Sequence, residues 1–156
     1  MGIFSDQAPD APAEVALVKK PGSILFVCGM NAIRSPMAEV LTRSLAGGKI
    51  YVASAGVTRG ERDMFVDAVL EEDGLSLKER QPVGLEELND GYFDLIITLT
   101  PQAHHVVLER MRGFAANVEY WPMPDPTLVT GSREQRLAAY RDVRDRLKRK
   151  ITERFL

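Results

Sequence analysis

Short runs of consecutive apolar residues alternate along this chain with stretches in which apolar residues recur at helical spacing. The runs are typical of strands buried on both faces, and they lie at 23–27, 50–53, 95–99 and 117–120. The helical stretches lie at 36–45, 61–72, 101–112 and from 133 almost to 156. Buried strands separated by helices predict an α/β layer fold with a parallel sheet.

Local signals at the ends of these stretches support the same division. Gly47 and Gly48 stop the first helix, Pro101 suits the first turn of the third, and Ser132 can cap the last. Residues 1–20 show no sustained period, so we expect a flexible N-terminal tail there. A single domain is then expected over 21–156.

Composition narrows the classes of function. The chain has 156 residues, 45% hydrophobic and 27% charged, with 20 Lys and Arg against 22 Asp and Glu. A net charge of −2 argues against a nucleic-acid partner, because such domains are usually strongly basic. No apolar run approaches the ~18 residues of a membrane span, and no signal peptide is visible. We therefore expect a cytoplasmic protein without a membrane partner.

Cysteine and histidine are too scarce for a metal centre. The single cysteine excludes an internal disulfide and a cysteine-based zinc site. The only histidines, His104 and His105, are adjacent and lack further ligands of the same kind. We read the pair as structural or as part of a site rim, and we expect neither a metal nor a cofactor.

The loop after the first strand has the composition of an oxyanion site. In α/β sheets, ligands bind at the carboxyl ends of strands, where loops enter helices. Here Cys28 ends the strand, Arg34 follows after five intervening residues, and Ser35 and Pro36 open the helix. Backbone N–H groups at a helix N-terminus can hold an oxyanion, and an arginine can grip two of its oxygens. The same groups favour a thiolate at Cys28, which is a nucleophile.

This loop resembles the C-x5-R-S-P signature of the low-molecular-weight protein tyrosine phosphatases. Ser54, Ala55 and Gly56, after the second strand, resemble that family's S-A-G segment. Asp125 and Pro126, about 90 residues beyond Arg34, resemble its late Asp-Pro loop. The resemblance covers roughly residues 23–156. It implies a three-layer sandwich with a central four-stranded parallel sheet and a phosphate-binding loop after the first strand.

The resemblance also implies roles for the residues that match. Cys28 attacks phosphorus and becomes a phosphocysteine, Arg34 binds the phosphate oxygens, and Asp125 is the general acid and then the general base. Ser35 donates a hydrogen bond to the thiolate, while Asn31 takes a left-handed loop position that Ser54 helps to fix. The implied phosphate-binding loop consists of Cys28, Gly29, Met30, Asn31, Ala32, Ile33, Arg34 and Ser35.

Four positions depart from the family pattern. Met30 stands where glycine is usual, and it cannot take a positive φ cheaply, so the loop must differ in shape or rim. Ile33 replaces a frequent second cysteine, which leaves Cys28 without a disulfide partner. Leu77 stands near a frequent histidine, so one supporting hydrogen bond should be missing. Thr127 replaces an aromatic residue after Asp-Pro. We expect walls of the substrate pocket from Met30, Tyr120, Trp121 and Thr127.

The leading hypothesis is a phosphomonoesterase of the protein tyrosine phosphatase type. Its partners would be a phosphotyrosine protein or an aryl phosphate, with phosphate, sulfate or vanadate as site ligands. Arsenate reductases share this loop, but an internal disulfide relay needs more cysteines than Cys28, which leaves a glutathione-coupled reductase as the alternative. A non-catalytic oxyanion-binding regulatory module on the same fold also stays open. The physiological substrate and the oligomeric state do not follow from the sequence.

Overall fold

The computed structural model describes residues 20–88, 92–112 and 117–156. The predicted tail therefore lies almost wholly outside the described residues. The strands are β1 (Ser23–Cys28), β2 (Tyr51–Gly56), β3 (Leu95–Thr98) and β4 (Asn117–Tyr120). The α-helices are α2 (Arg34–Leu45), α3 (Met64–Glu71), α4 (Pro101–Arg110) and α5 (Arg133–Phe155). Two short 3₁₀ helices are η2 (Leu85–Glu87) and η3 (Pro126–Leu128).

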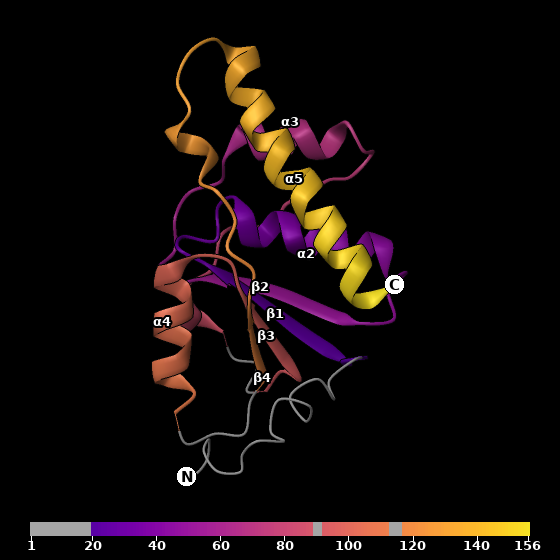
Figure 1. The fold of residues 1–156 in the computed structure, drawn as a ribbon, viewed down its shortest axis with the longest axis vertical. Helices are drawn as coiled ribbons and strands as arrows, with labels where there is room; N and C mark the ends of the chain where they lie inside the picture. Colours follow the sequence, from indigo (N-terminus) through magenta and orange to yellow (C-terminus); the bar gives the residue numbers. More distant parts are fainter. Residues whose placement is uncertain (1–19, 89–91, 113–116) are drawn as a thin grey trace.

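The strands form one parallel sheet in the order β2-β1-β3-β4. Helices α2, α3 and α5 lie on one side of the sheet and α4 lies on the other (Figure 1). The predicted α/β sandwich with a four-stranded parallel sheet is therefore confirmed. Because all strands run the same way, the loops after β1, β2, β3 and β4 meet at one edge of the sheet, where ligands of such folds bind.

Alternation along β1 separates two cores. Ile24, Phe26 and Cys28 point into the core shared with α2, α3 and α5. Leu25 and Val27 point into the smaller core against α4. The prediction that all four strands are buried on both faces is wrong for β4, whose residues are partly exposed. Its place at the edge of the sheet explains this, because one side of β4 has no neighbouring strand.

Most helix boundaries lie close to the predicted ones. Helix α2 starts at Arg34, two residues before the predicted start, so the arginine of the loop is also the first helical residue. Helix α3 starts at Met64, because the side chain of Asp63 accepts a hydrogen bond from the Phe65 N–H and caps it.

Helix α5 ties the structure together. Ser132 and Gln135 form a capping box at its start, and its buried stripe packs on α2 and α3. The Tyr140 hydroxyl donates to Asp63 Oδ2 at 2.7 Å, which joins α5 to the start of α3. Within the described residues, no helix is long and apolar enough to span a membrane.

Candidate active site

The loop between β1 and α2 is held by hydrogen bonds from the segment after β2 to its carbonyl groups. The carbonyl oxygens of Cys28, Gly29 and Met30 accept hydrogen bonds from the N–H groups of Val57, Thr58 and Gly60, at 2.8–3.0 Å. By contrast, the N–H groups of residues 29–34 donate to no acceptor in the described part of the chain. The loop therefore keeps a series of free donors at the N-terminus of α2, the arrangement that suits an oxyanion.

The sulfur of Cys28 lies at the base of this loop. Cys28 is 2% exposed, and its Sγ is 2.9 Å from the hydroxyl oxygen of Ser35 in the first turn of α2. The Ser35 hydroxyl also lies 3.3 Å from the Ala55 carbonyl oxygen and accepts from Asn31 Nδ2 at 2.8 Å. A hydroxyl in this place can donate a hydrogen bond to a thiolate and stabilise the negative charge on the sulfur.

Asn31 is the conformational pivot of the loop. Its φ is 56°, in the left-handed region, and its side chain is fully buried. Asn31 Oδ1 accepts from the Val83 N–H at 2.8 Å, while Nδ2 donates to Ser35 and to Ser54 Oγ at 3.0 Å. Asparagine tolerates this conformation better than most residues, and the buried contacts supply the rest of the stabilisation.

The expected difficulty at Met30 does not arise. Among the described residues, the non-glycine positions with positive φ are Asn31 and Lys78, so Met30 needs no left-handed conformation. Its side chain is 57% exposed on the rim of the loop. Met30 Cβ lies close to Gly60, where an added Cβ would be only 2.7 Å away. The methionine therefore fits because its neighbour across the loop has no side chain.

Arg34, at the end of the loop, is hydrogen-bonded to the segment that carries Asp125. Arg34 Nη1 donates to the Met123 carbonyl oxygen at 3.2 Å, and its Nε is buried without a partner among the described residues. Asp125 caps η3, and its Oδ1 accepts from the Thr127 N–H at 2.9 Å and the Thr127 hydroxyl at 2.7 Å. The segment that carries Asp125 is thus tied to the arginine of the loop through Met123.

Two opposing influences set the acidity of Asp125. Burial raises the pKa of its carboxyl group, but the two hydrogen bonds from Thr127 and the positive charge of Arg34 lower it. The net result is a pKa below the ordinary value for aspartate. Without a bound anion, Asp125 is therefore ionised near neutral pH.

Trp121, one of the expected wall residues, lies in the main core. Trp121 is 4% exposed and packs edge-on against Phe26 and beside Phe155 in the main core. Trp121 borders a hollow beside α5, which Arg149 and Lys150 also line. None of the loop residues 28–35 lines this hollow. The indole is drawn into the core because Phe26 and Phe155 offer it a large apolar surface.

The other expected wall residues and the histidines lie as follows. Tyr120 is partly exposed and stacks on His104, with ring centroids 4.5 Å apart. His104 Nδ1 is 2.8 Å from the hydroxyl of Thr98, at the end of β3. Thr127 is held by Asp125. No cluster of three metal-ligating side chains occurs within residues 20–88, 92–112 and 117–156.

The sequence analysis missed two charged residues behind the loop. Leu77 is buried in the core, and its hydrocarbon side chain cannot form a hydrogen bond. Arg80, three residues later, donates to Asn31 Oδ1 at 3.1 Å, so the supporting hydrogen bond expected to be missing is supplied from another position. Glu39 of α2 is 5% exposed and pairs with Arg80 at 2.9 Å. The one sequence feature that could have indicated this pair is Glu39, an acidic residue on the buried side of α2.

Comparisons with known proteins identify the family that this chain matches. A family model described as low molecular weight phosphotyrosine protein phosphatase matches residues 23–155. The glutaredoxin arsenate reductase of Synechocystis sp. is 28% identical over 128 residues, which cover 82% of this chain and 92% of that protein.

Two solved structures show the same mixture of activities. An arsenate reductase in the phosphate binding state is 27% identical with a TM-score of 0.65, covering 84% of this chain and 94% of its own. The tyrosine phosphatase amsI of Erwinia amylovora is 25% identical with a TM-score of 0.67, covering 85% and 92%. Similar proteins thus include both phosphatases and arsenate reductases.

The close approach of β2 to the loop gives a test of the loop's rigidity. A Cβ at Gly56 would lie 2.5 Å from the backbone nitrogen of Asn31, so we expect Gly56→Ala to displace the loop. Overpacking of this kind costs about 1–3 kcal/mol, which urea unfolding measures. Phosphate should also protect Cys28 from alkylation less well than in the parent protein.

Gly29→Ala is the matched control for unfolding. Its added Cβ meets Gln102 Oε1 at 3.5 Å, an ordinary contact. Equal unfolding midpoints for the two variants would contradict the idea that the Gly56 contact fixes the loop.

Proposed function

The chain belongs to the low molecular weight phosphotyrosine protein phosphatase family, and we propose that it is a phosphomonoesterase working through a phosphocysteine on Cys28. One arrangement carries the proposal: a buried sulfur 2.9 Å from the Ser35 hydroxyl, beneath a loop whose N–H groups are unused. The buried Arg34 Nε, which has no partner in the described part of the chain, adds a further donor for an oxyanion.

In the first step, the Cys28 thiolate attacks phosphorus. The S–P bond forms as the bond from phosphorus to the ester oxygen breaks, and Asp125 gives its proton to the departing oxygen. The N–H groups of residues 29–34 and the Arg34 guanidinium hold the three remaining oxygens. They stabilise the transition state more than the bound ester, because negative charge is spread over those oxygens as the bonds change.

In the second step, water hydrolyses the phosphocysteine. The Asp125 carboxylate takes a proton from the water, whose oxygen bonds to phosphorus as the S–P bond breaks. The sulfur leaves as a thiolate, to which Ser35 donates a hydrogen bond over the 2.9 Å separation. Inorganic phosphate is released, and Cys28 and Asp125 return to their starting protonation states.

The substrate we propose is a phosphotyrosine side chain or another aryl phosphate. Met30 is 57% exposed, so a substrate presented on a protein surface can reach this residue of the loop. Inorganic phosphate, sulfate and vanadate would occupy the same loop. The solved phosphate-bound state of a similar arsenate reductase supports an oxyanion ligand of this kind.

Substitution of the nucleophile and the acid tests the mechanism. We expect Cys28→Ser to abolish hydrolysis of p-nitrophenyl phosphate while vanadate still binds. Asp125→Asn should slow turnover by ~10²–10⁴-fold, the usual contribution of a general acid.

Thermal unfolding checks that both variants remain folded. A parent protein that binds phosphate tightly but does not turn over would favour the regulatory module instead. Equal rates in Asp125→Asn and the parent would remove Asp125 from the mechanism.

The Thr127 hydroxyl tests how Asp125 is tuned. This hydroxyl lowers the pKa of Asp125, so Thr127→Val should raise it. Because the general acid must be protonated, the alkaline limb of the kcat profile should then move to higher pH. Phenyl phosphate is the right substrate, since its poor leaving group depends on the proton.

Thr127→Ser keeps a hydroxyl and is the matched control, with an alkaline limb close to that of the parent. If the limb of Thr127→Val also stays in place, the Thr127 hydroxyl does not tune the general acid.

Arsenate reduction is the second candidate, favoured by the similar arsenate reductases. Cys28 would attack arsenate and release water, forming an S–As(V) bond. A first external thiol would then form a disulfide with Cys28 and release arsenite, which reduces arsenic by two electrons. A second external thiol would free Cys28 by exchange. The external thiols are required because the chain has one cysteine.

The expected outcome for a reductase is arsenate-dependent oxidation of glutathione, with or without glutaredoxin, followed by NADPH consumption through glutathione reductase. Cys28→Ser controls for uncatalysed reduction. Glutathione oxidation no faster than in that variant, beside measurable phosphatase turnover, would exclude the reductase.

A further inference from the structure

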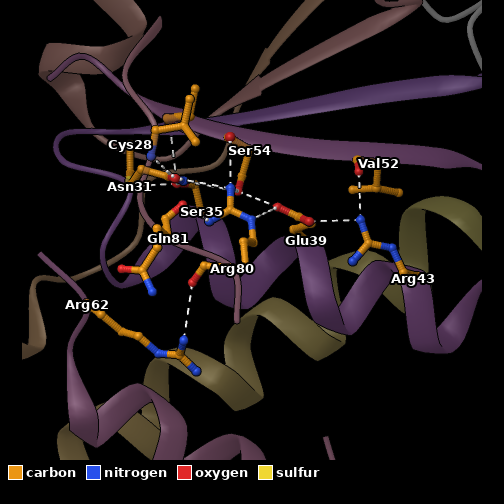
Figure 2. Close-up of polar contacts among 12 residues, drawn as sticks. Cys28, Asn31, Ser35, Glu39, Arg43, Val52, Ser54, Arg62, Arg80 and Gln81 are labelled. Carbon is orange, nitrogen blue, oxygen red and sulfur yellow. Dashed lines mark hydrogen bonds and ion pairs between the residues drawn. The ribbon is translucent and has the colours of Figure 1, made fainter. Parts of the chain in front are cut away.

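Behind the Cys28 loop lies an ion pair that no step of the proposed chemistry uses. Arg80 Nε is 2.9 Å from Glu39 Oε1, and the two side chains are 21% and 6% exposed. Arg80 Nη2 donates to Asn31 Oδ1 at 3.1 Å, to Ser54 Oγ at 2.6 Å and to the Ser54 carbonyl oxygen at 3.0 Å. Figure 2 shows the guanidinium of Arg80 between Glu39 on one side and Asn31 and Ser54 on the other.

The charges of Arg80 and Glu39 determine which of the neighbouring polar groups donate hydrogen bonds and which accept them. An arginine only donates hydrogen bonds, and a carboxylate only accepts them. The Ser54 hydroxyl accepts from Arg80, so its own proton goes to Glu39 Oε1 at 2.5 Å. Asn31 also accepts from Arg80 through Oδ1, which turns its NH₂ group toward Ser35 and Ser54.

This orientation continues to the sulfur. The Ser35 oxygen accepts from Asn31 Nδ2 at 2.8 Å, so the Ser35 proton remains available for Cys28 Sγ or the Ala55 carbonyl. An ionised sulfur can only accept hydrogen bonds, so it receives the hydrogen bond that the Ser35 hydroxyl donates. The hydrogen bonds thus run in one direction, from Arg80 through Asn31 and Ser35 to Cys28.

We propose that Arg80, held by Glu39, is a positioning residue for this site: its guanidinium orients the Asn31 amide and thereby commits the Ser35 hydroxyl to donate to the Cys28 thiolate. The kinetic part of this inference rests on the proposed phosphatase function. The part that concerns the state of the sulfur does not, because it needs only the loop.

The contacts of Glu39 separate this role from simple loss of an ion pair. Glu39 Oε2 is also paired with Arg43 at 2.8 Å, and the Ser54 hydroxyl donates to Oε1. Removal of Arg80 therefore leaves the buried carboxylate with two partners. Asn31 loses one of the two donors that fix its amide orientation, because its Oδ1 then keeps only the Val83 N–H. We therefore expect the effect at the loop rather than at the acid.

The surface beside Arg80 makes a chemical rescue practical. Arg80, Glu39, Arg43 and Lys78 border an open hollow of about 690 Å³ between α2 and the segment after α3. A small cation can reach the vacated place from this side once the arginine side chain is shortened. Guanidinium ion reproduces the head group of arginine, and urea has almost the same shape without the charge.

The experiment compares Arg80→Ala with the parent by two readouts. Cys28 is the only cysteine, so alkylation by iodoacetate reports on this sulfur alone, whether or not the protein turns over. We expect the midpoint of the alkylation rate against pH to move to higher pH in Arg80→Ala. We also expect kcat to fall ~10- to 100-fold with a much smaller change in KM, since misplacement of reacting groups has effects of this size.

Guanidinium at millimolar concentration should restore both readouts in Arg80→Ala, whereas urea at the same concentration should not. Arg80→Lys should be intermediate, because one ammonium group cannot contact Glu39, Ser54 and Asn31 in the geometry of a planar guanidinium. If Arg80→Ala does not fold, Arg80→Lys carries the same comparison with the parent.

Arg144→Ala is the matched control for lost stability. Arg144 is another buried arginine: it is 10% exposed at its side chain, bonds the Val69 carbonyl and pairs with Glu72, away from the loop. We expect it to lower the unfolding midpoint and leave the alkylation profile in place.

Three results would overturn the proposal. One is a folded Arg80→Ala protein with the alkylation midpoint of the parent. Another is recovery by urea as complete as by guanidinium, and the third is an equal alkylation shift in Arg144→Ala. A parent protein that hydrolyses no phosphate ester would defeat the proposed function alone, since the alkylation results would still decide the role of Arg80.

Discussion

The structure of this site depends on one residue held in an unfavourable backbone conformation. Asn31 is buried with φ at 56°, in the left-handed region. A left-handed asparagine is stable only where its surroundings compensate for the strain. Here the compensation comes from four polar partners contributed by α2, β2 and the segment between α3 and β3. The loop is therefore shaped by parts of the chain that are distant from it in the sequence.

The sheet topology makes this convergence possible. Parallel pairing of β1 with β2 sets Cys28 beside Gly56, so Cys28 and the S-A-G segment leave the sheet at the same level. Pairing of β3 with β4 brings the Asp125 segment to the same edge, where Met123 meets Arg34. The absence of a side chain at Gly56 and Gly60 lets the loops approach each other closely.

Local sequence predicted the elements that depend on local signals. The apolar runs predicted the positions of the strands, and the spacing from Cys28 to Arg34 predicted the position of the loop. Both signals lie within a few consecutive residues. The fate of Trp121 was not predictable in this way, since an indole beside a Pro-rich loop fits a pocket wall and a core equally well. The pairing of Glu39 with Arg80 joins residues 41 positions apart in the sequence, and neither has a neighbour that signals it. Only the packed structure brings them together.

Because Arg80 is an arginine, its contact with Asn31 does not depend on the pH of the surroundings. A guanidinium keeps its proton at any pH at which proteins are studied, while Leu77 nearby contributes only a buried hydrocarbon side chain. None of the described side chains bonded to Asn31 is a histidine. The groups that hold Asn31 are an arginine, two serine hydroxyls and a backbone N–H, and none of these four changes its charge near neutral pH.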